Sequence, residues 1–314
     1  MKKTLIASAI AAATFSGAAM AEGMPTVYGN IQLAAQYTDV EDAGHGTALE
    51  DNGSTLGVKH SHEIAPGIEG FLKIEFDGFE ADDKAHGRGR IRLDEAYIGV
   101  KGDSFGKIWV GSDDSTYETA IDEIANYFEY GALNLGGEYE TGEGDLIQYS
   151  SPSFAGLKLH GAVQYNGDAD VQNTEKSYPY QLAATYEIDA LEVAVAMDSN
   201  DSADGVNNEN TYGLRGSYAM GDLRLTAQYQ DRKDVGDVWG VFGGYTMGAN
   251  VFALSYEMAS EDNTDNEVST ISAQALHNVS DNLYVYVEGY LTNLDDGTSD
   301  TDVTQAVIGA TYYF

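Results

Sequence analysis

The chain has 314 residues, of which 16 are Lys or Arg and 51 are Asp or Glu, so its formal net charge is −35 at pH 7. This acidity argues against a nucleic-acid partner, because phosphates recruit basic surfaces, and it favours small cations as partners. Cysteine is absent, which excludes disulfide bonds, and the 36 Gly and 22 Tyr are spread evenly with only 4 Pro, which indicates one continuous architecture.

The first residues have the form of a secretory signal. Lys2 and Lys3 precede a run of small and apolar residues, and Ala19-Met20-Ala21 has the pattern of a cleavage site. We therefore expect residues 1–21 to be a signal peptide and 22–314 to be a single domain that begins at Glu22. Loss of the two lysines leaves 14 basic residues against 51 acidic ones, a net charge of −37.

The remaining chain alternates between apolar and polar residues with a period of two. In residues 157–166, Leu, Val and Tyr occupy odd positions, whereas Lys158, His160 and Gln164 occupy even ones. The same alternation recurs in residues 30–37, 68–77, 191–198, 223–230 and 252–258. A strand sends alternate side chains to opposite faces, so these segments are expected to be amphipathic strands. No later run of about 18 apolar residues predicts a membrane-spanning helix.

Short and long gaps alternate between these segments. Short gaps lie near 65–67, 102–106, 152–156, 189–190 and 280–282, and long acidic gaps lie near 39–53, 167–176, 199–210, 260–267 and 295–302. About sixteen strands joined in this way predict an all-β fold, a 16-stranded antiparallel transmembrane β-barrel with short turns on one rim and long loops on the other. A barrel of this size encloses water. A soluble acidic β-sandwich or β-solenoid is the alternative.

The last residues form an amphipathic strand that ends on aromatic side chains. Ile308, Ala310, Tyr312 and Phe314 share one face. This ending resembles the terminal strand of outer-membrane barrel proteins, which the barrel assembly machinery reads. The resemblance implies that Tyr312 and Phe314 act as an assembly signal.

Several strings, in order along the mature chain, resemble the general, trimeric and non-specific porins of Gram-negative outer membranes. They are residues 27–30 (VYGN), 95–102 (EAYIGVKG), 105–111 (FGKIWVG) and 145–157, the last with a Tyr-x-Ser-Pro-x-Phe-x-Gly pattern. The resemblance implies an outer-membrane homotrimer of sixteen-stranded barrels with short periplasmic turns, long external loops and an inward-folded third loop. It also implies passive diffusion of small hydrophilic solutes and ions, contact with outer-membrane lipids and lipopolysaccharide, and no cofactor.

The longest gap, about residues 112–144, corresponds by this resemblance to the third loop, which narrows the pore. A structureless stretch of this length is usually functional. Its acidic residues form the anionic side of the expected constriction: Asp113, Asp114, Glu118, Asp122, Glu123 and Glu138.

In the family, basic side chains on the inner wall face this loop. The residues of suitable parity here are Lys59, Lys73, Arg88, Arg90, Arg92 and Lys158. Cations facing anions across a narrow water gap would create a transverse field that aligns polar solutes. Alternatively, the arginines are ordinary solvated strand residues.

Two positions depart from the family pattern, because Asn30 and Thr55 stand where basic wall residues are expected. With the acidic mature chain, these losses lead to the hypothesis of a cation-preferring pore.

The remaining signals are weaker. His60 and His62 share a strand face but lack a third ligand, so we expect interfacial histidines and no metal site. His160 and His277 lie in no nucleophile motif, so no enzyme is expected. Two other functions stay open. One is a substrate-selective channel on the same scaffold, and the other is a secreted soluble β-protein that acts as an adhesin or binding module.

Overall fold

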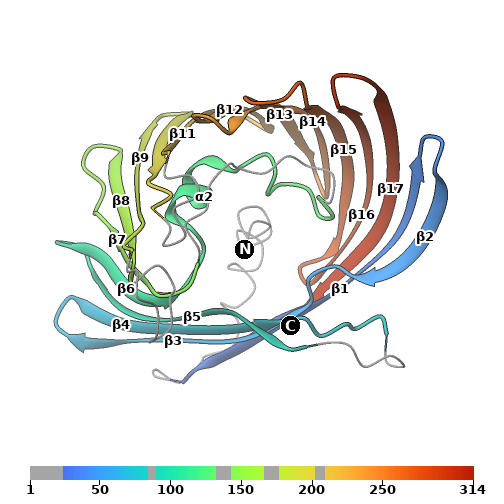
Figure 1. The fold of residues 1–314 in the computed structure, drawn as a ribbon. Helices are drawn as coiled ribbons and strands as arrows, with labels where there is room; N and C mark the ends of the chain where they lie inside the picture. Colours follow the sequence, from blue (N-terminus) through green and yellow to red (C-terminus); the bar gives the residue numbers. More distant parts are fainter. Residues whose placement is uncertain (1–23, 84–89, 132–142, 166–176, 202–208) are drawn as a thin grey trace.

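The computed structural model describes residues 24–83, 90–131, 143–165, 177–201 and 209–314, most of which form antiparallel strands around a central space that contains helix α2 (Figure 1). The expected signal peptide, residues 1–21, lies outside the described residues. The elements are β1 (Thr26–Val40), β2 (Gly44–Asp51), β3 (Thr55–Ala65), β4 (Ile68–Asp77), β5 (Arg92–Gly102), β6 (Gly106–Ser112), α2 (Thr116–Ile121), β7 (Leu146–Ser150), β8 (Leu157–Gln164), β9 (Tyr180–Ile188), β10 (Leu191–Asp198), β11 (Thr211–Met220), β12 (Leu223–Arg232), β13 (Gly236–Met247), β14 (Asn250–Glu261), β15 (Glu267–Ser280), β16 (Leu283–Asp295) and β17 (Asp300–Tyr313).

The sheet closes on itself between the first and last strands. β1 pairs with β17 from Asn30↔Tyr313 to Val40↔Val303. On its other edge, β1 pairs with β3 through its first half and with β2 through its second half. Because β2 and β3 lie end to end along β1, the seventeen strand segments make a closed barrel of sixteen strands, as the sequence predicts. Closure leaves no unpaired strand edge along the sheet, which lipid could not satisfy.

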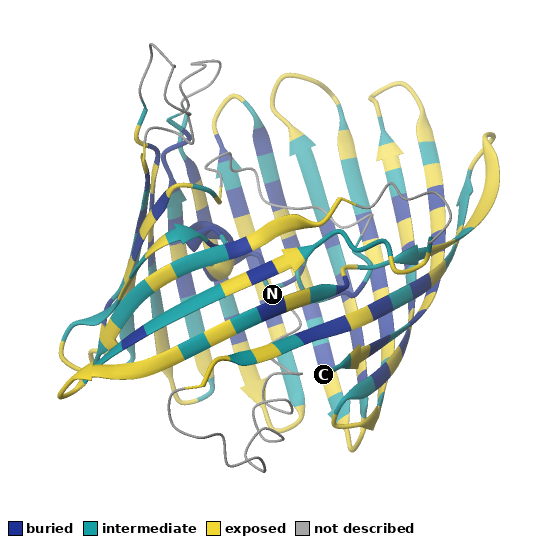
Figure 2. Ribbon diagram, turned by 90° about the horizontal axis from the view of Figure 1, so that it is seen from below, coloured by how far each residue is buried: buried dark blue, intermediate teal, exposed yellow. Residues whose placement is uncertain are grey.

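Burial is reversed relative to a soluble protein. Large apolar side chains are exposed on the outer face, such as Leu254 at 58% and Ile98 at 63%, whereas polar side chains such as Gln181 and Ser272 are fully buried inside. Exposed and buried bands alternate along the strands in Figure 2. This arrangement places the apolar face against hydrocarbon and the polar face toward the enclosed lumen.

The two rims of the barrel differ in their connections. On the short-turn rim, strands are joined by residues 66–67, 103–105, 151–156, 189–190, 221–222, 248–249 and 281–282. On the opposite rim, the connections 41–43, 233–235, 262–266 and 296–299 are fully described, and 78–91, 113–145, 165–179 and 199–210 are described in part. No helix within the described residues is long and apolar enough to cross a membrane.

Two local features differ from the sequence prediction. The gap expected at 39–53 is mostly a hairpin, because β2 extends the ladder of β1 beyond β3. In the ladder between β4 and β5, Glu75 pairs with Glu95, but the next residue, Phe76, pairs with Leu93. Asp94 is therefore a bulge, which shifts the inward and outward alternation of the β5 side chains by one residue. As a result Arg92 shares the lumen face with Tyr97, although strict alternation puts them on opposite faces.

Candidate pore-lining site

The segment after β6 turns into the barrel and begins with helix α2, which contacts β8, β9, β10 and β11 (Figure 1). Ser115 caps the helix, since its Oγ accepts a hydrogen bond from the Glu118 N–H at 3.2 Å. Gln181 on β9 holds this end, donating to Ser115 Oγ at 2.8 Å and accepting from the Tyr117 N–H at 3.1 Å. Tyr117 and Ile121 are fully buried, so α2 is packed onto the inner wall.

Beyond α2, the segment follows the inner wall toward β16. The Ile124 N–H donates to Gln228 on β12 at 3.1 Å. Phe128 packs edge-on against Phe242 on β13 and Tyr290 on β16, with ring centroids 6.5 and 6.1 Å apart. Residues 116–131 therefore cover the lumen face of the barrel from β8 to β16.

Glu288 on β16 anchors the far end of this segment. Its carboxylate accepts hydrogen bonds from the backbone N–H groups of Glu129 at 2.6 Å and Tyr130 at 2.9 Å. Glu129 in turn accepts from Gln32 at 3.0 Å and from the Tyr284 hydroxyl at 2.9 Å. These bonds tie the segment to β1 and β16, on the opposite side of the lumen from α2.

Glu123 anchors the middle of the segment through a cluster of donors on β11 and β12. It pairs with Arg215 Nη1 at 2.5 Å and with Arg224 Nε at 2.5 Å, and it accepts from the hydroxyls of Ser217 and Thr226. Burial favours the neutral carboxyl, but the hydrogen bonds from Arg224 and the charge of Arg215 outweigh it and lower the pKa of Glu123 to about 2.

The other acidic residues expected on this loop mostly face the wall. Asp113 accepts from the Trp109 indole N–H at 2.6 Å, and burial raises the pKa of Asp113 above its usual range. Asp122 accepts from Gln230 at 2.7 Å, and Glu118 accepts from Asn126 at 3.3 Å. Asp114 is half-buried. The expected residue Glu138 and the loop tip lie outside the described residues.

Two residues of the expected basic wall lie side by side on the lumen face. Lys59 and Lys73 are direct partners in the β3–β4 register, and both ammonium groups face the Tyr28 ring, at 5.2 and 5.9 Å from its centroid. Lys73 also forms an ion pair with Glu95.

The remaining basic-wall residues are more dispersed. Arg92 pairs with Asp77 at 2.9 Å, and Lys158 pairs with Glu187 at 3.4 Å near the short-turn rim. Arg90 is exposed, and Arg88 lies outside the described residues. The part that these residues and the loop acids have in a constriction stays a prediction.

A lysine that the sequence analysis did not single out lies beside this wall. Lys107 Nζ is 3.8 Å from the ring centroid of Trp109, 5.1 Å from that of Phe71 and 5.2 Å from that of Tyr97. The three rings come from β6, β4 and β5, so only the strand register brings them together. Distances of this order are attractive for an ammonium group over aromatic faces.

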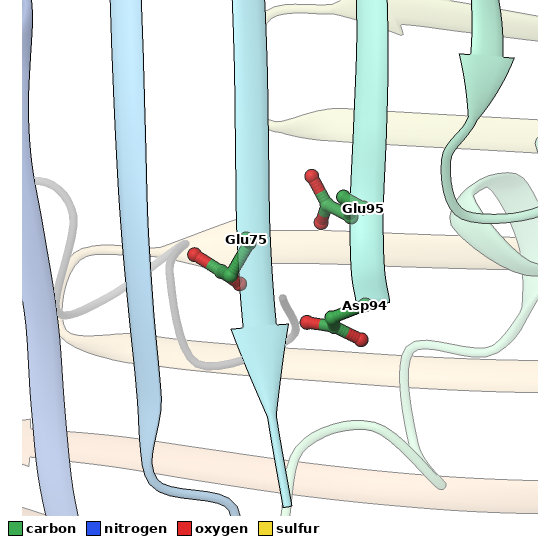
Figure 3. A group of neighbouring side chains, drawn as sticks. All are labelled: Glu75, Asp94 and Glu95. Atoms are coloured by element: carbon green, nitrogen blue, oxygen red, sulfur yellow. The ribbon is translucent and has the colours of Figure 1, made fainter. Parts of the chain in front are cut away.

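Three carboxylates converge on β4 and β5, as Figure 3 shows. Ligand oxygens of Glu75, Asp94 and Glu95 lie within 4.8 Å of one another. Lys73 Nζ contacts Glu95 and lies 3.8 Å from Glu75, so a lysine already supplies positive charge there. The three carboxylates and Lys73 are therefore best described as one cluster of opposite charges on this wall.

The two positions that depart from the family pattern bond to each other. Asn30 Oδ1 accepts from the Thr55 N–H at 3.0 Å and from its hydroxyl at 2.7 Å. The imidazole rings of His60 and His62 stack at 5.1 Å on the outer face, and His160 lies between Ser150 at 3.0 Å and Thr185 at 3.3 Å.

Sequence reasoning missed the main anchors of the inward segment: Arg215, Arg224, Gln181 and Glu288. Arg224 carried a usable signal, since it lies on the polar face of an alternating strand. For Glu288 and Gln181 no sequence signal distinguishes them from other polar residues of the lumen face.

The closed barrel, its apolar outer face and the polar lumen with an inward-folded segment define a transmembrane β-barrel of the channel-forming kind. Comparisons with known proteins agree with this class. Residues 7–297 match the Gram-negative porin family. The chain is 30% identical over 375 aligned positions to a monosaccharide porin of Halomonas sp., with all of both chains covered. It is 28% identical over 340 positions to the major outer membrane protein P.IB of Neisseria meningitidis, covering 100% of this chain and 89% of that one.

Solved structures share the same fold. The anion-selective porin from Comamonas acidovorans gives a TM-score of 0.76 at 17% identity, covering 93% of this chain and 100% of that one. OmpF of Salmonella typhi, in complex with daunomycin, gives 0.71 at 17% identity, covering 93% and 98%. The chain belongs to the Gram-negative porin family and is an outer-membrane porin channel. The family and the fold point to a channel rather than an enzyme, and they decide against a secreted soluble β-protein.

Proposed function

We propose that this porin is a passive diffusion channel for small hydrophilic solutes and ions that prefers cations. The observation that carries the preference is a one-sided distribution of basic residues. Residues 24–58 and 234–314, which hold β1, β2 and β13–β17, contain no Lys or Arg, yet Glu50 lies on their lumen side, where it accepts hydrogen bonds from Gln36 and from the Tyr130 hydroxyl. A channel wall with one sign of charge raises the local concentration of the opposite ion.

The cations of the other strands are largely balanced by neighbouring carboxylates. Lys73 pairs with Glu95, Arg92 with Asp77, and Lys158 with Glu187. On β11 and β12, two arginines share Glu123, and Arg215 also pairs with Glu192. A passing cation is therefore opposed by few uncompensated positive charges. The anion-selective porin from Comamonas acidovorans shares the fold, and its selectivity does not transfer at 17% identity.

We further propose that residues of about 112–144 narrow the pore. The acidic side comprises Asp113, Asp114, Glu118, Asp122, Glu123 and Glu138, and the basic side comprises Lys59, Lys73, Arg88, Arg90, Arg92 and Lys158. The inward course of residues 116–131 along β8–β16 supports this role, because the wall they leave uncovered is the one that carries Lys59 and Lys73. Because the described loop acids are largely bonded to the wall, we expect them to fix the loop rather than to line the water.

A homotrimer in the outer membrane is the proposed assembly. Exposed aromatic side chains that suit a membrane interface gather on the outer face of β7–β14. They are Tyr149, Tyr180, Tyr186, Tyr212, Tyr218, Tyr229, Trp239, Tyr245 and Phe252. The outer face of β15–β17 and β3–β6 is mostly aliphatic, with residues such as Val285, Val287 and Ile98, which suits contact between subunits. The mass of the detergent-solubilised protein tests this, and a single-chain mass contradicts it.

Export and assembly complete the proposal. Residues 1–21 act as a cleaved signal peptide, and Tyr312 and Phe314 serve as the signal for the barrel assembly machinery. In the closed barrel both side chains are exposed, at 53% and 49%, on the apolar outer face. N-terminal sequencing of the exported protein should begin at Glu22.

A sugar-selective channel is the second candidate. One relative is named a monosaccharide porin, and the rings of Tyr28, Phe71, Tyr97 and Trp109 line one wall of this lumen. Saturation of solute flux by a monosaccharide would identify this function.

The reversal potential across a planar bilayer under a tenfold KCl gradient tests the leading proposal. The sign of a cation-selective membrane is expected, and glucose uptake into liposomes should rise linearly with concentration. An anion-selective sign overturns the cation preference, and no conductance at all overturns the channel itself.

A further inference from the structure

We propose that Lys107 and the three rings around it form a subsite for organic carboxylates whose body is apolar, such as aromatic acids. The proposal rests on the chain being a solute channel, but not on its preference for cations. The subsite lies on the lumen face of β4, β5 and β6 near the short-turn rim, where Lys107 is the second residue of β6.

Lys107 differs from most lysines of this wall in what surrounds its ammonium group. Lys73, Lys101 and Lys158 each form an ion pair with a glutamate. Among the described residues, Lys107 has no carboxylate within ion-pair distance, and its charge is held over aromatic faces instead. A half-buried ammonium group without a carboxylate is ready to accept one from a solute, in a charge-assisted hydrogen bond.

The aromatic cradle consists of the rings of Phe71, Tyr97 and Trp109 around Lys107. The register of β4, β5 and β6 determines the positions of these rings. Gly99 lies on β5 between Phe71 and Trp109. A Cβ added there would come within 2.4 Å of Phe71 Cζ and 2.6 Å of Trp109 Cβ. Because Gly99 has no Cβ, the Phe71 ring can occupy this space beside Trp109. The indole N–H of Trp109 is fixed by Asp113, which restrains the orientation of its ring.

The charges around the subsite act in both directions. Lys101 is the direct partner of Lys107 in the β5–β6 register, although Glu69 already pairs with it. The carboxylates of Asp113 and Glu95 also act on Lys107, and they weaken its attraction for any anion. A small inorganic anion can interact only with the ammonium group of Lys107. An aromatic carboxylate can interact with the same group and also pack its ring against Phe71 and Tyr97. The subsite is therefore expected to favour organic anions over chloride.

The occupied face of Trp109 decides between a carboxylate and a sugar. With Lys107 Nζ 3.8 Å from the centroid, a pyranose ring that stacked on Trp109 would have to displace the ammonium group. A carboxylate binds the ammonium group where it already lies. The same geometry thus favours an acid over a neutral sugar at this place.

The test compares the permeability of benzoate with that of acetate, from reversal potentials between sodium chloride and each sodium salt at a pH well above the pKa of both acids. K107Q should lower the benzoate-to-acetate permeability ratio at least about threefold, because it removes the charge that holds benzoate against the rings. F71L should lower the same ratio and leave acetate unchanged. K233Q is the control, since it removes an exposed lysine that pairs with Glu209 in the connection between β12 and β13, on the rim opposite the subsite, and it should leave the ratio unchanged.

Three results overturn the proposal. They are an equal loss of benzoate and acetate permeability in K107Q, an equal effect of K233Q, and an unchanged ratio in both K107Q and F71L. A competing block of benzoate flux by glucose that depends on Lys107 would reassign the subsite to sugars. Potassium and chloride reversal potentials in the same membranes report the ion preference separately, so that failure of the subsite and failure of the proposed function are distinguishable.

Discussion

Neutralising Glu123 should loosen the inward segment and move the ion selectivity toward anions. In E123Q the side chain keeps its size, but one carboxylate oxygen becomes an NH₂ group. That group can accept none of the hydrogen bonds that Arg215, Arg224 and Thr226 donate to Glu123 in the native protein. Arg215 and Arg224 then share only the amide oxygen of the E123Q side chain. Their positive charges are no longer neutralised there and attract anions in the lumen.

The magnitude follows from the burial of the three charged groups. The side chains of Arg215 and Glu123 are only 6% and 14% exposed, whereas that of Arg224 is 37% exposed and is screened by water. Breaking a buried ion pair by removing one partner costs about 3–5 kcal/mol. Since Arg215 retains Glu192 and Arg224 is solvated, the lower end applies, and E123Q should reduce the free energy of unfolding by about 3 kcal/mol.

The pH dependence of this anchor has a definite sign. The pKa of Glu123 is lowered from 4.5 to about 2, so the folded state binds this proton less readily than the unfolded state. Its stabilisation is complete above the ordinary carboxyl pKa and is lost as the pH falls through about 2. The stability difference between the native protein and E123Q should therefore be constant from about pH 7 to about pH 5 and should shrink progressively as the pH falls from there toward about 2.

Denaturant unfolding in lipid vesicles measures the stability, and reversal potentials under a KCl gradient measure the selectivity. The matched control is E209Q, which neutralises a glutamate paired with the exposed Lys233 and should change neither quantity. An E123Q protein with native stability and native reversal potential would refute the reasoning, as would a difference that disappears near pH 5.

The remaining predictions concern the far anchor, the lipid face and the aromatic cradle. E288Q should increase open-channel current noise, because an amide cannot accept from both the Glu129 and Tyr130 N–H groups, and native noise in single-channel records would contradict this. L254R should destabilise the barrel by about 2–4 kcal/mol in vesicle unfolding, since Leu254 is exposed in the middle of β14, and a loss near zero would mean that this face is not in lipid. G99A should reduce the yield of folded barrel on unheated gels, because its Cβ would lie 2.4 Å from the Ile108 carbonyl oxygen, and a native yield would contradict the close strand approach.

The strands and their closure were predictable because lipid and water impose a period of two on the sequence. The outer residues of β14, such as Leu254, are apolar because they face lipid. The inner residues can be polar because they face the lumen, so the pattern along the strand is a simple alternation. β2 escaped prediction since its residues, GHGTALED, lack such a face. It becomes a strand because it pairs with the extension of β1 beyond β3. The bulge at Asp94 escaped because a shift of one residue in one strand leaves no trace in composition.

The candidate site was predictable only to the level of charge and face. The parity of Lys59 and Lys73 gave their lumen face, because strand alternation determines it. The partner of Glu123 was not predictable, since the chain has 51 acidic residues and the pairing joins a loop to strands about a hundred residues away. The cradle of Lys107 depends on the register of β4, β5 and β6, which determines which rings meet.

Thiol labelling at adjacent residues of one strand tests most directly the claim that one face of the barrel lines water and the other meets lipid. The native chain contains no cysteine, so each single-cysteine variant is read without background. Lys59 lies on the lumen face of β3 and Val58 on the outer face. A charged, membrane-impermeant thiol reagent should react rapidly with K59C and change the channel current, while V58C in bilayers should stay unreactive. Equal reaction at both positions, or a change of current only in V58C, would contradict the account.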